Sequence, residues 1–255
     1  MGLKDLFGGG KKKEELREKA KEVVSKGKLE PGKAEELKAL AQEHEGDLAD
    51  DKTRMRRSIY NKAAGAAKAR GKLSETEAAE LAKIQKFLAL RDDQVEMTKR
   101  DLAGLRQVTD IRSGKLPTVP ASNVAMRGVP LDSGEVAHHV VHVEIQDRPS
   151  PSGQPGMQVK WATPYSVNSA RGHSLPTDGA KDQGEGYLIF TNKRMILRNA
   201  AGKTAAVAFN PQANLFLYGD GLRIERTVGN TILRFKSKSD GTAEIVGELL
   251  AALMR

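Results

Sequence analysis

Residues 186–197 read Gly-Tyr-Leu-Ile-Phe-Thr-Asn-Lys-Arg-Met-Ile-Leu, and this stretch predicts a β-hairpin. Two apolar runs flank four polar residues, which is the pattern of two strands joined by a tight turn. Asparagine in such a turn tolerates a positive φ, and neighbouring threonine and arginine side chains hydrogen-bond nearby backbone carbonyls. We therefore expect a structural role for the four turn residues, Thr191, Asn192, Lys193 and Arg194.

The sequence on both sides of this hairpin continues the strand pattern from about Val129 onward. Short alternating stretches are separated by Gly, Asn, Asp or Pro, which predicts antiparallel strands joined by turns. The expected strands are 136–145, 157–162, 187–190, 194–198, 204–209, 215–218, 222–226 and 231–235. Residues 242–254 then carry apolar residues at helical spacing. Seven or eight strands closed by one helix predict an antiparallel barrel or sandwich.

Residues 186–197 resemble the G-x-L-x-x-T-x-x-R-l-x-l hairpin of bacterial pleckstrin-homology-like (PH-like) and GRAM domains. Residues 217–224, Leu-Tyr-Gly-Asp-Gly-Leu-Arg-Ile, are similar to a later hairpin of the same domains. The resemblance covers residues 129–255 and implies a PH-like barrel capped by a C-terminal helix, which binds or assembles without catalysis. A phosphoinositide pocket is not expected, because only Arg148 and Lys160 are basic in the region of the first hairpin.

The composition changes near residues 114–120, where Gly114 is followed by two prolines. The preceding part is rich in Ala, Lys, Glu and Leu and contains a single proline, Pro31. Glycine ends helices and proline favours extended structure before it, so we expect a linker here. The predicted fold class is α+β, with a flexible basic tail at 1–13, a helical domain at 14–112, a linker at 113–128 and a β domain at 129–255.

The helical part repeats itself with a spacing of about 44 residues. Residues 23–37 and 67–81 both contain a Gly-Lys-Leu turn, which predicts a helix, a turn and a second helix in each copy. In the second copy Ser74 and Glu77 predict a capping box. Pro31 marks the same place in the first copy, because proline fits the first turn of a helix. We expect about five helices in this part of the chain.

A helix, a Gly-x-Leu turn and a second helix also form the skeleton of an EF-hand, but the calcium ligands are missing. In the second copy the first, third and fifth loop positions would hold Ala66, Lys68 and Arg70, and cationic groups repel Ca²⁺. We therefore expect no calcium site. The stretch 73–81 is similar to the tellurite-resistance TerB-like helical domains, which implies a TerB-like unit, but its basic turn argues against a metal there.

Eight basic residues and no acidic one lie between Asp51 and Glu75, so this run carries the strongest local charge of the sequence. On a helix, most of the polar residues of the run lie opposite the apolar face formed by Met55, Ile59, Ala63 and Ala66. The candidate surface for an anionic partner consists of Arg54, Arg57, Lys62 and Lys68. Such a partner is nucleic acid, acidic lipid or acidic protein. The alternative is a solvated face balanced by Glu35, Glu36, Glu43 and Glu45 of the neighbouring helix.

The N-terminus combines apolar and basic residues over a short length. The apolar residues on one helical face and the lysines that follow them are Leu3, Leu6, Phe7, Lys11, Lys12 and Lys13. Apolar side chains in the headgroup region and lysines near an anionic leaflet give a weak and reversible membrane contact. The alternative is a frayed tail, which is common at chain ends.

Composition excludes several classes of site. The 255 residues include no cysteine, which excludes disulfides, zinc–thiolate sites, iron–sulfur clusters and a cysteine nucleophile. His138, His139 and His142 are not expected to bind a metal, because on a strand the middle side chain points away and the outer two lie about 13 Å apart. We expect no cofactor and no enzyme, and an unrecognised hydrolase or transferase is the remaining alternative. No signal peptide or membrane span is recognised, so a cytoplasmic location is expected.

These features favour a non-enzymatic interaction or adaptor protein. A PH-like module and a helical domain would mediate association with a protein partner or a second copy of the chain. Part of this association would take place at the cytoplasmic face of the membrane, where the protein would bind peripherally. The alternative is a nucleic-acid-associated protein that uses the basic helix 52–72. The lack of a reader motif and an aromatic content of only 4%, which leaves few rings for base stacking, speak against this alternative.

Overall fold

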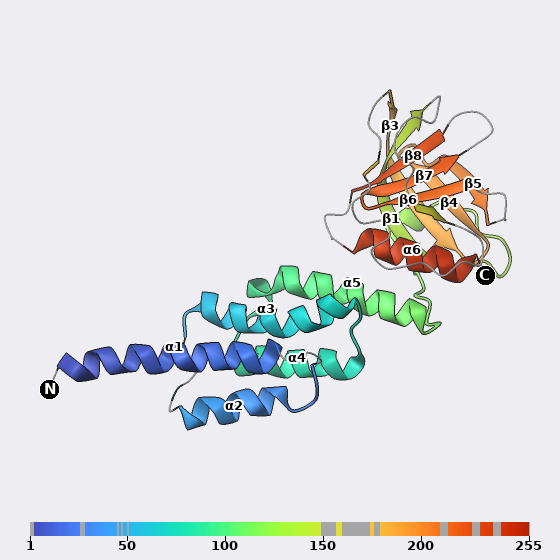
Figure 1. Cartoon of the computed structure of the whole chain (residues 1–255). Coiled ribbons are helices and arrows are strands. Elements are labelled where there is room, and N and C mark those ends of the chain that lie inside the picture. The colour runs from blue at the N-terminus through green and yellow to red at the C-terminus, as the bar shows by residue number, and fades with distance from the viewer. Residues whose placement is uncertain are drawn as a thin grey trace. The chain divides into compact units, whose positions relative to one another are not determined.

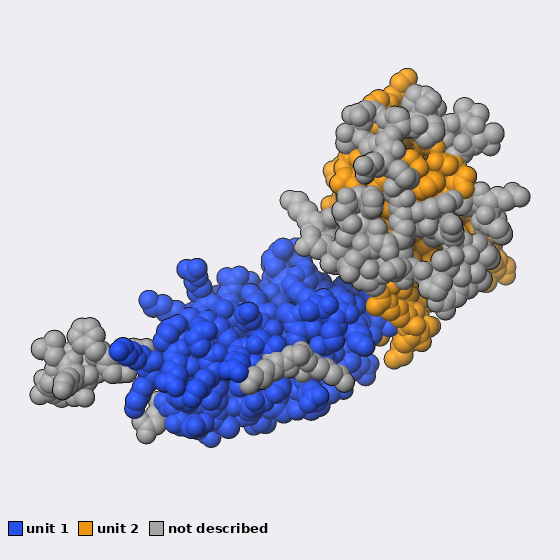
Figure 2. Space-filling model, in the orientation of Figure 1, with its two compact units in different colours: residues 1–109 blue, residues 110–255 orange. Residues whose placement is uncertain are grey.

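Figure 1 shows the computed structural model of the chain. It describes residues 3–25, 29–44, 46, 48, 49, 51–148, 157–159, 174, 175, 179–209, 214–225, 230–236 and 241–254. The side chains of residues 3–10, 148 and 157–159 are outside this description. The chain divides into two compact units, residues 1–109 and residues 110–255 (Figure 2).

The first unit is helical. Its elements are α1 (Leu3–Ser25), α2 (Lys33–Glu43), α3 (Thr53–Arg70), α4 (Glu75–Phe87), a short 3₁₀ helix η1 (Asp92–Gln94) and α5 (Glu96–Arg112). α1 packs on α2 and α3, and α4 packs on the same two helices. The prediction of about five helices before residue 112 is confirmed within the described part of the chain. α5 continues past Thr109 into the second unit.

The apolar faces of the helices in the first unit form one core. Leu81 and Ile84 of α4 and Leu88, its C-cap, recur at helical spacing, and all three are buried in one cluster with residues such as Leu37 and Ile59. Full burial of a leucine or isoleucine stabilises a fold by about 1.5–3 kcal/mol. The spacing of these residues therefore fixes which face of α4 points inward.

The turn between α3 and α4 confirms the predicted capping box. Ser74 Oγ accepts a hydrogen bond from Glu77 N at 3.3 Å, and the Glu77 carboxylate accepts one from Ser74 N at 3.0 Å. α3 ends at Gly71, whose φ of 63° is a left-handed conformation that glycine adopts without strain. Leu73 lies between the two caps and is buried, as is Leu29 at the equivalent place of the first copy.

The start of α2 differs from its counterpart in the second copy. The helix begins at Lys33, and its N-cap is Gly32 with a φ of 98° and no side-chain hydrogen bond. Pro31 precedes this cap, so its predicted place in the first helical turn is wrong. The acceptor that the N-cap side chain would otherwise provide comes from α4. The Glu80 carboxylate, which is 1% exposed, accepts a hydrogen bond from Ala34 N at 2.5 Å. Its negative charge also lies at the positive end of the α2 dipole.

The second unit contains an eight-stranded antiparallel sheet in the order β2-β6-β7-β8-β1-β3-β4-β5. Its strands are β1 (Ala137–Arg148), β2 (Met157–Val159), β3 (Lys181–Thr191), β4 (Arg194–Asn199), β5 (Thr204–Ala208), β6 (Asn214–Tyr218), β7 (Gly221–Glu225) and β8 (Asn230–Phe235). The sheet curls, and α6 (Thr242–Leu253) follows its last strand (Figure 1). The predicted α+β class is therefore confirmed. All eight expected strands are found among the described residues, and β1 and β3 are longer than predicted. Residues 160–162 of the expected strand 157–162 lie outside the description.

The sheet is covered by apolar residues of α6 and of the segment before β1. α6 packs on β2 and β6, and Val246, Leu249 and Leu250 on this helix are buried. On another part of the sheet, Met126 of the short 3₁₀ helix η2 (Val124–Met126) packs with Ile189 of β3. The segment that the sequence presents as a linker therefore contributes to the core of the β unit.

Candidate functional site

Helix α3 has one buried face and one charged face. The buried residues are Ile59, Tyr60, Ala63, Ala64 and Ala67. Met55 and Ala66, which were predicted on the same face, are half-buried. Because successive residues of a helix are about 100° apart, burial of this face leaves the cations of the run on the outside.

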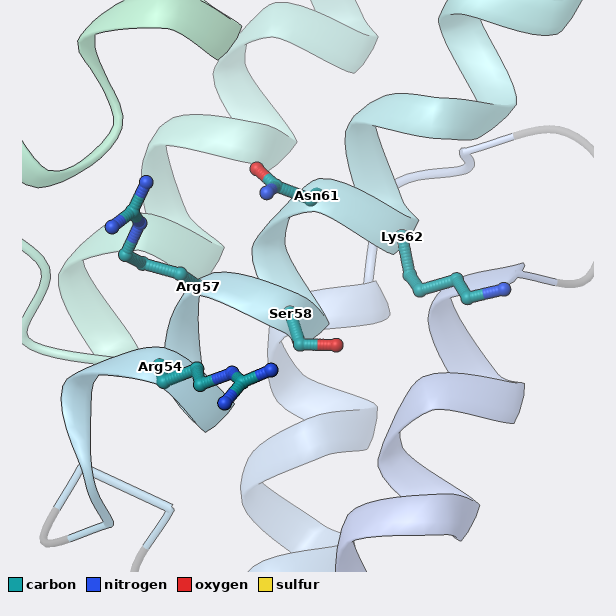
Figure 3. Close-up of a pocket in the computed structure, with 5 residues that line it drawn as sticks. All are labelled: Arg54, Arg57, Ser58, Asn61 and Lys62. Atoms are coloured by element: carbon teal, nitrogen blue, oxygen red, sulfur yellow. The ribbon is translucent and has the colours of Figure 1, made fainter.

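Arg54, Arg57 and Lys62 are exposed on α3 and have no hydrogen-bond or ion-pair partner among the described residues. Together with Ser58 and Asn61 they line a hollow of about 500 Å³ (Figure 3). All five lining residues come from α3, so the hollow is a depression on the helix surface. We call these five residues the α3 cationic surface.

Two other cations of the same run are paired. Lys68 binds the carboxylate of Asp101 on α5, and Arg70 binds the carboxylate of Glu77 on α4. An ion-paired cation must break its bond before it can receive another anion. Lys68, which the sequence groups with the other three candidates, therefore differs from them.

The acidic residues of α2 do not balance α3. Glu35 pairs with Lys38 at 2.7 Å and Glu36 pairs with Lys33 at 2.6 Å, both within α2. The physical reason is that α2 packs on α1 and α4. The interpretation of α3 as a face neutralised by α2 is therefore wrong for Glu35 and Glu36. Glu43 is exposed and forms no ion pair with α3 among the described residues, and Glu45 lies outside them.

The two flanks of the α3 cationic surface differ. Asn61 Oδ1 accepts a hydrogen bond of 2.8 Å from Thr98 on α5. Lys62, on the other flank, also lines a second hollow of about 420 Å³ with α1 residues that include Glu15 and Glu18. These carboxylates pair with lysines of α1, at 3.3 Å and 2.6 Å. Lys62 is thus the member of the surface that lies beside acidic groups.

The chemistry of the α3 cationic surface suits an anion with several oxygen atoms. Two guanidinium groups and one ammonium group donate charge-assisted hydrogen bonds, and Ser58 and Asn61 add a hydroxyl and an amide. A single exposed ion pair contributes about 0–1 kcal/mol in water. Useful affinity therefore requires a partner that engages several of these groups at once.

The side chains of the turn Thr191–Arg194 form hydrogen bonds within the fold. Thr191 Oγ1 donates to the Glu135 carboxylate at 2.6 Å, and Arg194 donates two bonds to it at 3.0 and 2.9 Å. Asn192 and Lys193 donate to backbone oxygens in the segment before β1. These four side chains hold that segment against the hairpin, so Lys193 and Arg194 are engaged within the fold.

Glu135 is the residue of this cluster that the sequence does not reveal. Its side chain is buried, and burial alone would raise the pKa of its carboxyl group. Hydrogen bonds from Asp132 N, Thr191 and Arg194 outweigh burial and hold the pKa below its usual range. An isolated glutamate just before a strand carries no signal in the sequence that distinguishes it from an exposed one.

The three histidines of β1 have separate environments. His138 Nδ1 lies 2.7 Å from Pro117 O, and His142 Nε2 lies 3.0 Å from the Glu185 carboxylate. Burial lowers the pKa of His139 to about 4, so this side chain is neutral at pH 7. In the part of the chain that the structure describes, no three His, Asp or Glu side chains form a group that could hold a metal ion.

The N-terminal segment is part of α1, which begins at Leu3, whereas the sequence predicts a flexible tail over residues 1–13. Lys11, Lys12 and Lys13 are exposed on this helix. The side chains of the apolar residues predicted to contact a membrane, Leu3, Leu6 and Phe7, lie outside the described residues. Among the described residues, no helix combines the length and the apolar character needed to cross a bilayer.

Comparison with known proteins leaves the family open. No protein-family model matches the sequence, and no curated protein matches it. The resemblances to PH-like, GRAM and TerB-like domains therefore stay predictions that rest on the residues quoted above.

Proposed function

We propose that this chain is a non-enzymatic interaction protein that binds an acidic partner protein through the α3 cationic surface. The observation that carries the proposal is that Arg54, Arg57 and Lys62 are exposed and have no partner in the part of the chain that the structure describes. Other exposed cations of the same unit, such as Lys38 and Arg100, are paired with carboxylates. An unpaired group of cations on one face attracts and orients an acidic surface.

The distances involved suit a protein-sized contact. Arg54 and Lys62 are eight residues apart, which corresponds to about 12 Å along the helix axis. Electrostatic attraction between exposed charges extends over about 8 Å at physiological ionic strength. The three cations therefore act on one acidic patch together, and added salt should weaken that attraction.

The β unit is the second part of the proposed adaptor. We expect a PH-like module there, and the curled antiparallel sheet followed by α6 supports that expectation. We expect the module to bind protein and not a lipid headgroup. Lys193 and Arg194 of the hairpin 186–197 are used in internal hydrogen bonds. We also propose that the protein is cytoplasmic and that the lysines of α1 give it a weak contact with the membrane.

Nucleic-acid binding is the second candidate, because phosphates suit the same three cations. The small number of phosphate contacts that three cations can make favours a protein partner. Three phosphate contacts predict that the affinity for duplex DNA falls by about 40-fold between 50 and 200 mM salt, against about 10³–10⁵ for proteins that make six to ten contacts. A surface of this size would hold duplex DNA only weakly.

Titration of the full chain with three anionic probes tests this proposal. The probes are fluorescein-labelled poly-L-glutamate, a random-sequence duplex and vesicles that contain phosphatidylserine, each at low and at physiological salt. We expect saturable, salt-sensitive binding of poly-L-glutamate and weaker binding of the duplex. No binding of poly-L-glutamate at low salt contradicts the proposal, and a duplex that binds more tightly replaces it with the nucleic-acid candidate.

The vesicle titration also tests the membrane contact of α1. Replacing Lys11, Lys12 and Lys13 by alanine removes three exposed charges from this helix. Each lysine near an anionic surface contributes about 1 kcal/mol, so vesicle binding should be lost in the variant. Unchanged vesicle binding would show that the contact lies elsewhere on the molecule.

A further inference from the structure

The exposed face of α3 has two rows of side chains with a four-residue spacing. One row consists of Arg54, Ser58 and Lys62, and the other contains Arg57 and Asn61. In Figure 3 the side chains of the first row point to one side of the helix and those of the second row to the other. The residues of both rows line the hollow, and three of the five carry a positive charge.

The middle of this face is made of small side chains. Ser58 and Asn61 are short, and Gly65 continues the second row without a side chain. A Cβ atom added at Gly65 would meet no atom within 4 Å, so the space above this residue is open. Rows with four-residue spacing are the ones that interdigitate in the commonest packing of two helices. The rows on the exposed face of α3 therefore offer a second helix a surface on which to pack.

Charge selects the kind of helix. The cations in both rows, which have no partner among the described residues, favour a helix with carboxylates at four-residue spacing, which places successive charges about 6 Å apart along its axis. A second copy of this chain fits poorly, because it would bring the same cations to this face. Its exposed carboxylates at Glu35 and Glu36 are also already paired.

We propose that the α3 cationic surface receives an acidic α-helix of another protein, seated between the Arg54–Lys62 row and the Arg57–Gly65 row. This inference rests on the proposed function and adds the shape of the partner to its charge. An extended polyanion or a duplex would reach the exposed cations whatever the depth of the hollow. Only a packed helix requires that Gly65 stay small.

Substitution of Gly65 separates shape from charge, because it changes no charged group. Gly65→Leu places a bulky side chain on the exposed face of α3, one turn beyond Asn61, and Gly65→Ala is the matched control with a methyl group that has free space. Both replacements improve helix propensity, so neither should unfold α3. Circular dichroism and thermal unfolding of the full chain verify that both variants are folded.

The probes are two labelled peptides of about 20 residues with the same alanine-rich composition, long enough to form helix in water. One carries glutamates at four-residue spacing on one face, and its isomer distributes the same glutamates around the helix. We expect the first peptide to bind the wild-type chain about tenfold or more tighter than its isomer. We also expect Gly65→Leu to reduce this affinity about tenfold or more, and Gly65→Ala to leave it unchanged.

Equal binding of the two peptides, or equal affinity of the wild type and Gly65→Leu, overturns the helix inference. If poly-L-glutamate still binds in that case, the proposed function stands and only the shape of the partner is wrong. If neither peptide nor poly-L-glutamate binds, the inference and the proposed function both fail.

Discussion

Glu135 holds the Thr191–Arg194 turn, although 59 residues separate it from Arg194 in the sequence. Its carboxylate accepts bonds from a hydroxyl, a guanidinium group and a backbone amide. A buried carboxylate with three kinds of donor is more stable in its charged form, which explains the lowered pKa.

This pKa predicts how the β unit responds to acid. Because the folded-state pKa of Glu135 is lowered, its contribution is present above the unfolded value of about 4.3 and is lost as the pH falls through the folded value. Glu135→Gln should cost about 1–3 kcal/mol at pH 7, because it weakens the charge-assisted bonds. Denaturant unfolding of the wild type and the variant at pH 7 and pH 3 measures both effects. A difference between the two proteins that does not shrink at pH 3 would contradict this assignment.

Ala89 is a second residue whose effect on stability can be measured. It follows α4 with a φ of 47°, which is unfavourable for a residue with a Cβ atom. Arg56 donates to Ala89 O at 3.4 Å and to Leu88 O at 3.3 Å, so the chain is held in this conformation at the end of α4. Ala89→Gly should stabilise the helical unit by about 0.5–1 kcal/mol.

The matched control for Ala89→Gly is Ala79→Gly on the exposed side of α4, where the backbone is helical. This replacement should destabilise the unit by about 0.5–1 kcal/mol, because glycine is a poor helix former. Urea unfolding, monitored by circular dichroism, measures the change in stability of both variants. A loss of stability in both variants would show that Ala89 is not strained.

At the scale of elements, α2 depends on a residue of α4. Glu80→Ala should cost the helical unit about 1–3 kcal/mol, because it leaves Ala34 N buried without an acceptor. Glu80→Gln keeps an oxygen acceptor and should cost less. The unfolding midpoints of the two variants give their losses of stability. Equal losses would mean that the bond to Ala34 N does not support α2.

Local patterns predicted most elements of this chain, because their causes lie within a few residues. The capping box at Ser74 and the short strands β4 to β7, which are separated by Gly, Asn, Asp or Pro residues, are examples. The first part of β3 was missed, since residues 181–185 are exposed and polar and pair with β1 through the backbone. The cap on α2 was missed because Glu80 and Ala34 are 46 residues apart.

At the scale of the whole molecule, the formal charge of +9 does not identify a binding surface. The run of basic residues in α3 was visible in the sequence, but its division into free and paired cations was not. Lys68 reaches an acid on α5, 33 residues away, whereas Arg54 and Arg57 meet none among the described residues. This division depends on helix packing, which charge patterns do not reveal.

Two triple variants with the same change in net charge test whether the partner binds at the α3 cationic surface. Arg54→Ala, Arg57→Ala and Lys62→Ala together remove the three cations of this surface. The matched control replaces exposed cations that are paired on the surface, Lys38, Arg91 and Arg100, by alanine. Each variant lowers the formal charge of +9 by three.

The affinity of both triple variants for poly-L-glutamate at low salt is the measurement. We predict a loss of about tenfold or more for the Arg54, Arg57 and Lys62 variant, since several weak ion pairs are removed together. The control should stay within about twofold of the wild type, because its cations already have partners. Equal losses in the two variants, or no loss in the first, would contradict binding at α3.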